Sequence, residues 1–156
     1  MSSEAENLRT LNRTLDALTL LSGSWPAPGI QGAIMRRSGV AIDVATAVLL
    51  LKLAHLGGSA RPSLLGRTTH TNASTVSKTL ARMTAAGLVH RAAEQGDLRA
   101  VSITLTPRGH AAVEAINNAG MSILDEAVKD WPIEDIRRFA RYLQRLAQAL
   151  TPPALD

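Results

Sequence analysis

Apolar residues recur at helical spacing near both ends of the chain. Within residues 4–22, four leucines stand three or four positions apart, namely Leu8, Leu11, Leu15 and Leu18. A similar stripe in the last segment consists of Ile133, Ile136, Phe139, Leu143, Leu146 and Leu150. This spacing gathers apolar side chains on one face of a helix. We therefore predict an amphipathic helix at each end of the chain, and each apolar face needs a cover.

A buried helix is predicted in the interior of the sequence. From Asp43 to Leu56, apolar residues fall on nearly every side, Asp43 suits the N-cap, and two glycines follow. A shorter helix is expected over residues 30–37, after a Pro- and Gly-rich break at 23–29. We expect the helix that begins after Asp43 to form the centre of the core.

The next segment predicts two short helices joined by a turn. Pro62 suits the first turn of a helix over residues 62–69. Asn72 can then cap a second helix over 73–86, which Gly87 ends. Two short helices separated by a tight turn are the arrangement of a helix-turn-helix.

A hairpin and a long helix are predicted to follow. Residues 88–92 and 100–105 are candidate strands, because apolar and polar residues alternate in the second of them. They flank a polar turn at 94–97. A long helix over 107–129 is expected after the hairpin, with Thr106 as its cap.

This order of elements describes a winged helix, in which a β-hairpin follows the helix-turn-helix. We predict a mainly α-helical fold with a small β-hairpin wing. Residues 43–106 are expected to form the winged-helix lobe, and the helices within 1–40 and 107–151 a dimerisation region. Dimerisation would cover apolar patches of a size that monomers seldom expose. The alternative is that these stripes fold back on the chain's own core.

Positive charge gathers in the winged-helix segment. The 156 residues include 17 Lys and Arg against 13 Asp and Glu. Residues 61–99 hold six of the basic and two of the acidic residues, so the whole excess lies there. A localised basic patch is typical of a surface that binds a polyanion, and a solvated basic face is the alternative. The six basic residues are Arg61, Arg67, Lys78, Arg82, Arg91 and Arg99.

The composition excludes several other classes of protein. The sequence contains no cysteine, which excludes disulfides and thiol chemistry. Its most apolar stretch, 44–56, contains Lys52 and is too short for a membrane span. The first residues lack the features of a secretory signal. We therefore expect a soluble, cytoplasmic protein with no membrane partner.

No motif supports catalysis or requires a cofactor. The sequence has neither a phosphate-binding glycine loop nor a His-Glu-x-x-His zinc motif. Ser74 and Lys78 do not have the Ser-x-x-Lys spacing of a serine nucleophile with a lysine base. A metal site of His55 or His110 with Asp16 is an alternative that the spacing does not require. We predict that the protein is not an enzyme and holds no cofactor or metal.

Five motifs resemble the signature of multiple-antibiotic-resistance-type (MarR) regulators. They are Arg-Pro-Ser-Leu-Leu (61–65), Ser-Thr-Val-Ser-Lys (74–78), Ala-Ala-Gly-Leu-Val (85–89), Asp-Leu-Arg-Ala (97–100) and Leu-Thr-Pro-Arg-Gly (105–109). The resemblance implies a homodimeric transcriptional regulator, usually a repressor, whose first and last helices interlock with those of a second chain. We expect it to bind a pseudo-palindromic operator in double-stranded DNA.

The winged helix supplies the candidate DNA contacts. Polar residues in the N-terminal half of the second helix are expected to approach bases and phosphates, namely Ser74, Thr75, Ser77 and Lys78. We assign Lys78 chiefly to phosphate. Arg82 and Arg91 are candidate backbone contacts, with a plain surface role as the alternative for each. Asp97 and Arg99 match the family's Asp-x-Arg element, in which the acid orients an arginine toward a narrow minor groove.

The turn of the helix-turn-helix departs from the family pattern. Thr69 and Thr71 stand where the family usually places aliphatic residues. Their hydroxyl groups need hydrogen-bond partners, so we expect the first helix to be short or mobile there.

The resemblance also implies a small aromatic or anionic effector, bound between the dimer helices and the winged lobe. The candidate effector residues are Arg9, Arg13, Trp25, Arg36 and His55. Each has surface or packing alternatives. The expected dimer interface consists of Leu8, Leu11, Leu15, Leu18, Ile136, Phe139, Leu143 and Leu146.

A second function class remains open. A winged helix can also be a protein-interaction module that binds an acidic partner through its basic face. The small polar residues on the second helix and the basic wing favour DNA over this alternative.

Overall fold

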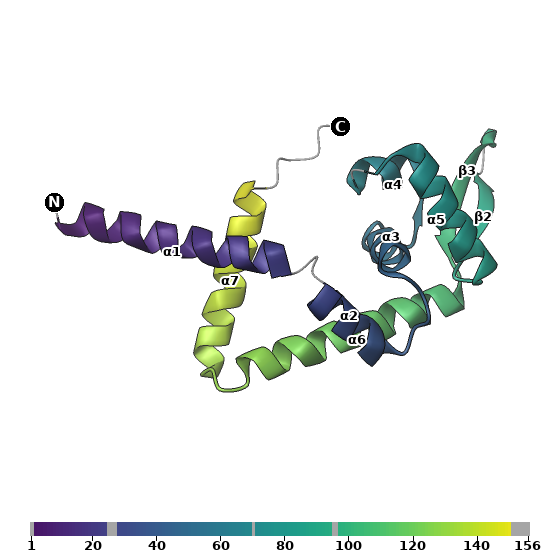
Figure 1. Ribbon diagram of the computed structural model, residues 1–156. Coiled ribbons are helices and arrows are strands. Elements are labelled where there is room, and N and C mark those ends of the chain that lie inside the picture. The colour runs from purple at the N-terminus through teal and green to yellow at the C-terminus, as the bar shows by residue number, and fades with distance from the viewer. Residues whose placement is uncertain (1, 25–27, 70, 95–96, 151–156) are drawn as a thin grey trace. The chain divides into compact units, whose positions relative to one another are not determined.

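The computed structural model describes residues 2–24, 28–69, 71–94 and 97–150 (Figure 1). Side chains are described for 6–19, 29–69, 71–92 and 101–150. The elements are α1 (Ser2–Ser24), α2 (Pro28–Ser38), α3 (Val44–His55), β1 (Ser59–Ala60), α4 (Pro62–Thr68), α5 (Ala73–Ala85), β2 (Val89–Glu94), β3 (Asp97–Leu105), α6 (Pro107–Val128) and α7 (Ile133–Leu150). The predicted helical fold with a small hairpin is confirmed.

Two compact units divide the chain inside α6, at residues 1–120 and 121–156. The first contains α3, α4, α5 and the strands, which lie together in Figure 1. In the second, the Trp131 and Phe139 rings meet edge to face with centroids 5.6 Å apart. Among the described residues, no helix has both the length and the apolarity of a membrane span.

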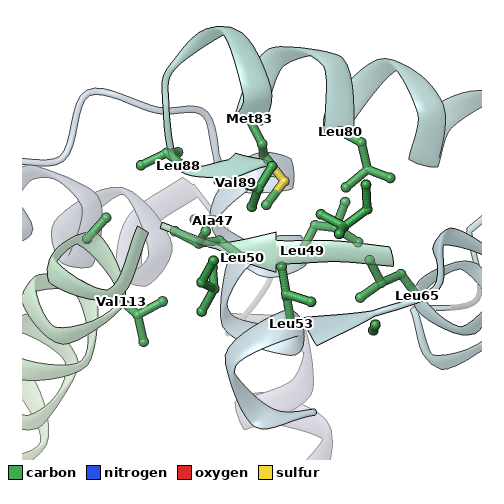
Figure 2. Packing of buried hydrophobic residues seen from close by; sticks show 14 of the residues in the cluster. Ala47, Leu49, Leu50, Leu53, Leu65, Leu80, Met83, Leu88, Val89 and Val113 are labelled. Carbon is green, nitrogen blue, oxygen red and sulfur yellow. The ribbon is translucent and has the colours of Figure 1, made fainter. Parts of the chain in front are cut away.

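The core is built around α3, as the sequence predicts. Leu50 and Leu53 of this helix are fully buried. Figure 2 shows Leu80 and Met83 pointing from α5 toward the cluster that these leucines fill. The other large, fully buried side chains are Leu65 of α4, Val89 of β2 and Ile103 of β3. The helix-turn-helix and the hairpin therefore share one hydrophobic core.

The sheet contains a third strand that the apolar pattern of the sequence does not predict. Its order is β1-β3-β2, and all pairs are antiparallel. The two-residue strand β1 places Ser59 opposite Thr104, and the two hydroxyl oxygens are 2.9 Å apart. Two residues are too few to show an alternating pattern, which explains the omission.

The hairpin strands are longer than predicted. Strand β2 extends to Glu94 and β3 begins at Asp97, and these two residues pair with each other after a register shift at Ala93. They therefore belong to the strands and not to the predicted turn at 94–97. Backbone pairing continues past the alternating apolar residues because it does not depend on side-chain polarity.

Threonine hydroxyls at the end of α4 bond to nearby carbonyl oxygens. Thr69 donates to the Leu65 carbonyl at 2.6 Å, and Thr71 donates to the Thr69 carbonyl at 3.0 Å. Helix α4 is only seven residues long and ends at Thr68. The predicted short helix is confirmed, and local side-chain bonds of this kind compete with helix extension.

The start of α6 is tied closely to the end of α5. The Thr106 hydroxyl donates to the Gly87 carbonyl at 2.6 Å and accepts from the Gly109 N–H at 3.0 Å. The Thr106 N–H donates to the Leu88 carbonyl at 3.0 Å. A Cβ atom at Gly109 would collide with that carbonyl. The backbones can therefore approach only because residue 109 is glycine.

Candidate nucleic-acid interface

Helix α5 has one buried face and one polar face. Its buried residues are Val76, Thr79, Leu80 and Met83. The predicted contact residues Ser74, Thr75, Ser77 and Lys78 are all exposed. Because Leu80 and Met83 are anchored in the core, the polar face is held at the surface of the winged helix.

The N-terminus of α5 is fixed by Asn72. Its side-chain oxygen accepts a hydrogen bond from the Thr75 N–H at 2.9 Å. This cap satisfies one of the N–H groups that the first turn of a helix leaves without partners. It thereby holds the turn that carries Ser74 and Thr75 at the surface.

We expect Asn72→Ala to lower the free energy of unfolding by about 1 kcal/mol, because the cap is lost. Urea unfolding followed by circular dichroism measures the change. Asn72→Ser is the matched control, since serine is an equally good N-cap and should retain most of the stability. Equal losses in both variants would contradict the capping role.

A groove of about 880 Å³ lies between α4, α5 and the hairpin. Ser77 and Val76 of α5 line it beside Arg67 of α4, and Arg91 and Val101 of the hairpin close its far side. Arg67 and Arg91 are exposed, so both guanidinium groups are accessible from solvent. The groove joins the polar face of α5 to two positive charges.

Arg67 is a groove residue to which the sequence analysis gave no site role, although its charge was counted. Gly66 and Arg67 follow Ser63 by three and four residues, so the three share one face of α4, and all of them line the groove. That spacing along α4 is the signal that was available in the sequence.

The hairpin supplies Arg91 from the face that it turns toward the helices. Arg91 pairs with Ile103, and Val101 lies two residues before Ile103 on the same face of the sheet. Ile103 is fully buried, whereas Arg91 extends to the surface of the groove. Asp97 and Arg99 lie in β3, but their side chains are outside the described residues.

Arg82 lies against the first turn of α3. Its Nη1 atom is 3.4 Å from Oδ2 of Asp43, and its Nη2 donates to the Thr79 hydroxyl at 3.2 Å. Partial burial raises the pKa of the Asp43 carboxyl, but hydrogen bonds from Thr46 and the Arg82 charge outweigh it. The pKa therefore lies below its ordinary value, and the carboxylate is charged at neutral pH.

The candidate effector residues that the structure describes do not line this groove. Arg9 and Arg13 lie exposed on α1, Arg36 on α2 and His55 on α3, while Trp25 is outside the described residues. Within the part of the chain that the structure describes, no group of three or more His, Cys, Asp or Glu residues is arranged to hold a metal ion. The structure thus places Ser77 of α5 and Arg91 of the hairpin on one groove, whereas Arg9, Arg13, Arg36 and His55 lie elsewhere.

The predicted interface leucines of α1 are accessible. Leu8, Leu11 and Leu15 are 59, 64 and 62% exposed, and Leu18 is half-buried. No residue of α7 is buried, and its Phe139 and Leu143 are exposed while Ile136 and Leu146 are half-buried. Both apolar stripes therefore lack a cover within their own compact units.

Known proteins share both sequence and structural features with this chain. The MarR family model matches residues 42–100, which contain α3, α4, α5 and most of the hairpin. The amino-acid sequence matches none of the curated proteins with which it was compared.

Solved structures share the fold over most of the chain. A MarR family protein from Bacillus stearothermophilus is 21% identical, with a TM-score of 0.67, and the match covers 96% of this chain and 97% of that one. A mutant of MarR from E. coli is 19% identical, with a TM-score of 0.68 and coverage of 85 and 96%.

An organohalide-sensing transcriptional regulator, solved in its 2,4-dichlorophenol-bound form, is 18% identical. Its TM-score is 0.60, and the match covers 87% of this chain and 81% of that one. At these identities the likeness shows the fold, while the family model concerns only residues 42–100. The family model covers residues 42–100, and solved MarR structures share the fold over most of the chain, so the winged-helix segment of this protein is similar to the MarR family.

Proposed function

We propose that this protein is a transcriptional regulator that binds double-stranded DNA with sequence preference. The observation that carries the proposal is the continuous surface formed by the polar face of α5 and the groove with Arg67 and Arg91. Helix α5 would enter the major groove, and the hairpin would reach a minor groove. The match of residues 42–100 to the MarR family model, and the fold shared with a solved MarR family transcription regulator, support this proposal over an enzymatic function.

The surface offers both kinds of contact that DNA recognition needs. Ser74, Thr75 and Ser77 carry short polar side chains that can bond to base edges. Lys78, with Arg67 and Arg91 beside the groove, can neutralise phosphates. Contacts to phosphate position a protein on the duplex, and contacts to base edges select the sequence.

Selection of bound fragments from a random duplex pool tests the proposal. We expect an enriched, pseudo-palindromic motif with half-site centres about 10 base pairs apart, which is one helical turn. If no motif is enriched and the protein binds polyglutamate as tightly as it binds duplex DNA, its binding depends on charge alone. That result would favour the alternative, a module that binds an acidic protein partner.

The pseudo-palindrome requires two copies of the chain. We propose that the apolar stripes on α1 and α7 of one chain pack against those of a second chain in a homodimer. Both stripes are accessible within their own compact units. Oligomers of this kind usually have two-fold symmetry, which a palindromic operator matches.

Leu15→Asp and Leu146→Asp are each expected to give monomers, because a carboxylate would be buried without a partner in the interface. Multi-angle light scattering measures the mass of each variant. The matched control is Ala45→Asp, an exposed position on α3 that lies in the winged-helix lobe and outside the predicted dimerisation region. A dimer in both leucine variants would contradict the interface.

We further propose that the regulator is a repressor relieved by a small aromatic or anionic molecule. The relative solved with 2,4-dichlorophenol supports this class of effector. Titration of the protein–DNA complex with a panel of chlorinated phenols and aromatic carboxylates is the test. Release of the duplex by one member is the expected result, and release by none would contradict the proposed class.

A further inference from the structure

A polar network joins α5, the helix proposed to enter the major groove, to α3, the central helix of the core. Thr46 of α3 and Thr79 of α5 are the buried polar side chains among the described residues, 2 and 3% exposed. Each belongs to a pair with a charged residue one helical turn away, Asp43 for Thr46 and Arg82 for Thr79. The Arg82 guanidinium connects the two pairs.

The geometry of the network restricts the guanidinium. Asp43 caps α3 through Oδ1, which accepts from the Thr46 N–H at 2.9 Å, while Oδ2 accepts from the Thr46 hydroxyl at 3.1 Å. Arg82 approaches the same Oδ2 with one nitrogen and bonds to Thr79 with the other. Because a guanidinium is planar and its donors point in fixed directions, two partners on two helices define its orientation.

The pairing also changes the charge that α5 presents. The Asp43 carboxylate lies 3.4 Å from the guanidinium and offsets its positive charge. Lys78, one turn earlier on α5, is exposed and has no such acid among the ion pairs of the described residues. Attraction to phosphate is therefore expected from Lys78 and much less from Arg82.

We propose that Arg82 is a positioning residue for DNA recognition. It sets the rotation of α5 on α3 through Asp43, and so aims Ser74, Ser77 and Lys78, without itself contacting phosphate. The inference rests on the proposed DNA-binding function and replaces the backbone contact expected for Arg82 from the sequence.

The network has little effect on overall stability, which makes it testable. The side chains of Arg82 and Asp43 are 56 and 49% exposed, and exposed ion pairs contribute little to folding. Substitutions of either residue should leave a folded protein. These substitutions are expected to disturb the placement of α5 on α3, and they should therefore lower the affinity for the selected DNA sequence.

The experiment measures affinity for the selected duplex and for a scrambled duplex at several salt concentrations. We expect Arg82→Ala to weaken binding of the selected duplex about three- to fivefold, which is the most that an exposed ion pair can contribute to placing α5, with an unchanged salt slope. A phosphate contact would instead weaken both duplexes alike and lower the slope by about 1.

Two further variants separate positioning from contact. Arg82→Lys keeps the charge but cannot hold two partners in fixed directions, so it should lose as much affinity as Arg82→Ala. Asp43→Ser keeps the cap of α3 but is too short to reach Arg82, and it should show the same loss. If Arg82 contacts phosphate, Arg82→Lys retains affinity and Asp43→Ser increases it, because an acid near DNA is removed.

A double-mutant cycle completes the test. Asp43→Ser combined with Arg82→Ala should lose no more affinity than either single variant, because both break the same link. Additive losses would overturn the inference. The pair Asp135–Arg138 on α7, 3.7 Å apart at the surface, supplies control variants that should leave affinity unchanged. Failure of the wild-type protein to prefer any duplex would instead overturn the proposed function.

Discussion

Gly109→Ala is expected to lower the free energy of unfolding by about 3 kcal/mol or more, the upper range for overpacking a core. The added Cβ would collide with the Leu88 carbonyl oxygen, which is backbone and cannot rotate away as a side chain does. The same oxygen accepts from the Thr106 N–H, so moving it also disturbs the link between β2 and α6. Urea unfolding measures the loss.

Gly120→Ala is the matched control for this substitution. Gly120 lies in the same helix, α6, and a Cβ there would meet no atom within 4 Å. Alanine is favoured over glycine in a helix interior, so stability should rise by about 0.5–1 kcal/mol. A small effect at Gly109, comparable with that at Gly120, would contradict the close approach of the two backbones.

Lys78→Glu is expected to weaken DNA binding about a hundredfold, because a negative carboxylate would replace the positive ammonium group that faces phosphate. Lys78 is exposed on the polar face of α5, so folding should be unaffected. The salt slope should also fall by about 1 for each protomer that loses a phosphate contact. Fluorescence anisotropy with a labelled duplex measures both quantities.

Lys129→Glu is the matched control for the charge change. Lys129 is exposed beyond the end of α6 and outside the winged helix, and the substitution alters the net charge equally. Its effect on affinity should be within about twofold if DNA binds through the winged helix, because distant charges are screened by salt. Equal losses in both variants would show that only total charge matters.

The sequence predicts most of the fold because its signals are local. Asp43, Asn72 and Thr106 stand at helix starts and cap them as expected, and the apolar spacing identifies the buried faces of α3 and α5. Strand β1 was not predicted because two residues show no alternation of apolar and polar side chains. The hairpin strands were predicted to be shorter than they are. Both errors concern backbone pairing, which side-chain patterns report only indirectly.

The candidate site was predictable only where its residues follow a local helical pattern. The polar face of α5 follows from helical periodicity, so Ser74, Ser77 and Lys78 could be chosen from the sequence. The partners of Arg82 and the groove position of Arg67 depend on which helices meet. Asp43 and Arg82 are far apart along the chain, and one sequence alone gives no sign of such a contact.

DNA recognition by α5 is tested by titrating the protein against two duplexes of equal length, the selected sequence and a scrambled one. The selected duplex is expected to bind at least about 10³-fold more tightly near physiological salt. The logarithm of the binding constant should also fall linearly with the logarithm of salt concentration. Equal affinity for the two duplexes, or binding that does not respond to salt, would contradict DNA recognition by α5 and its groove.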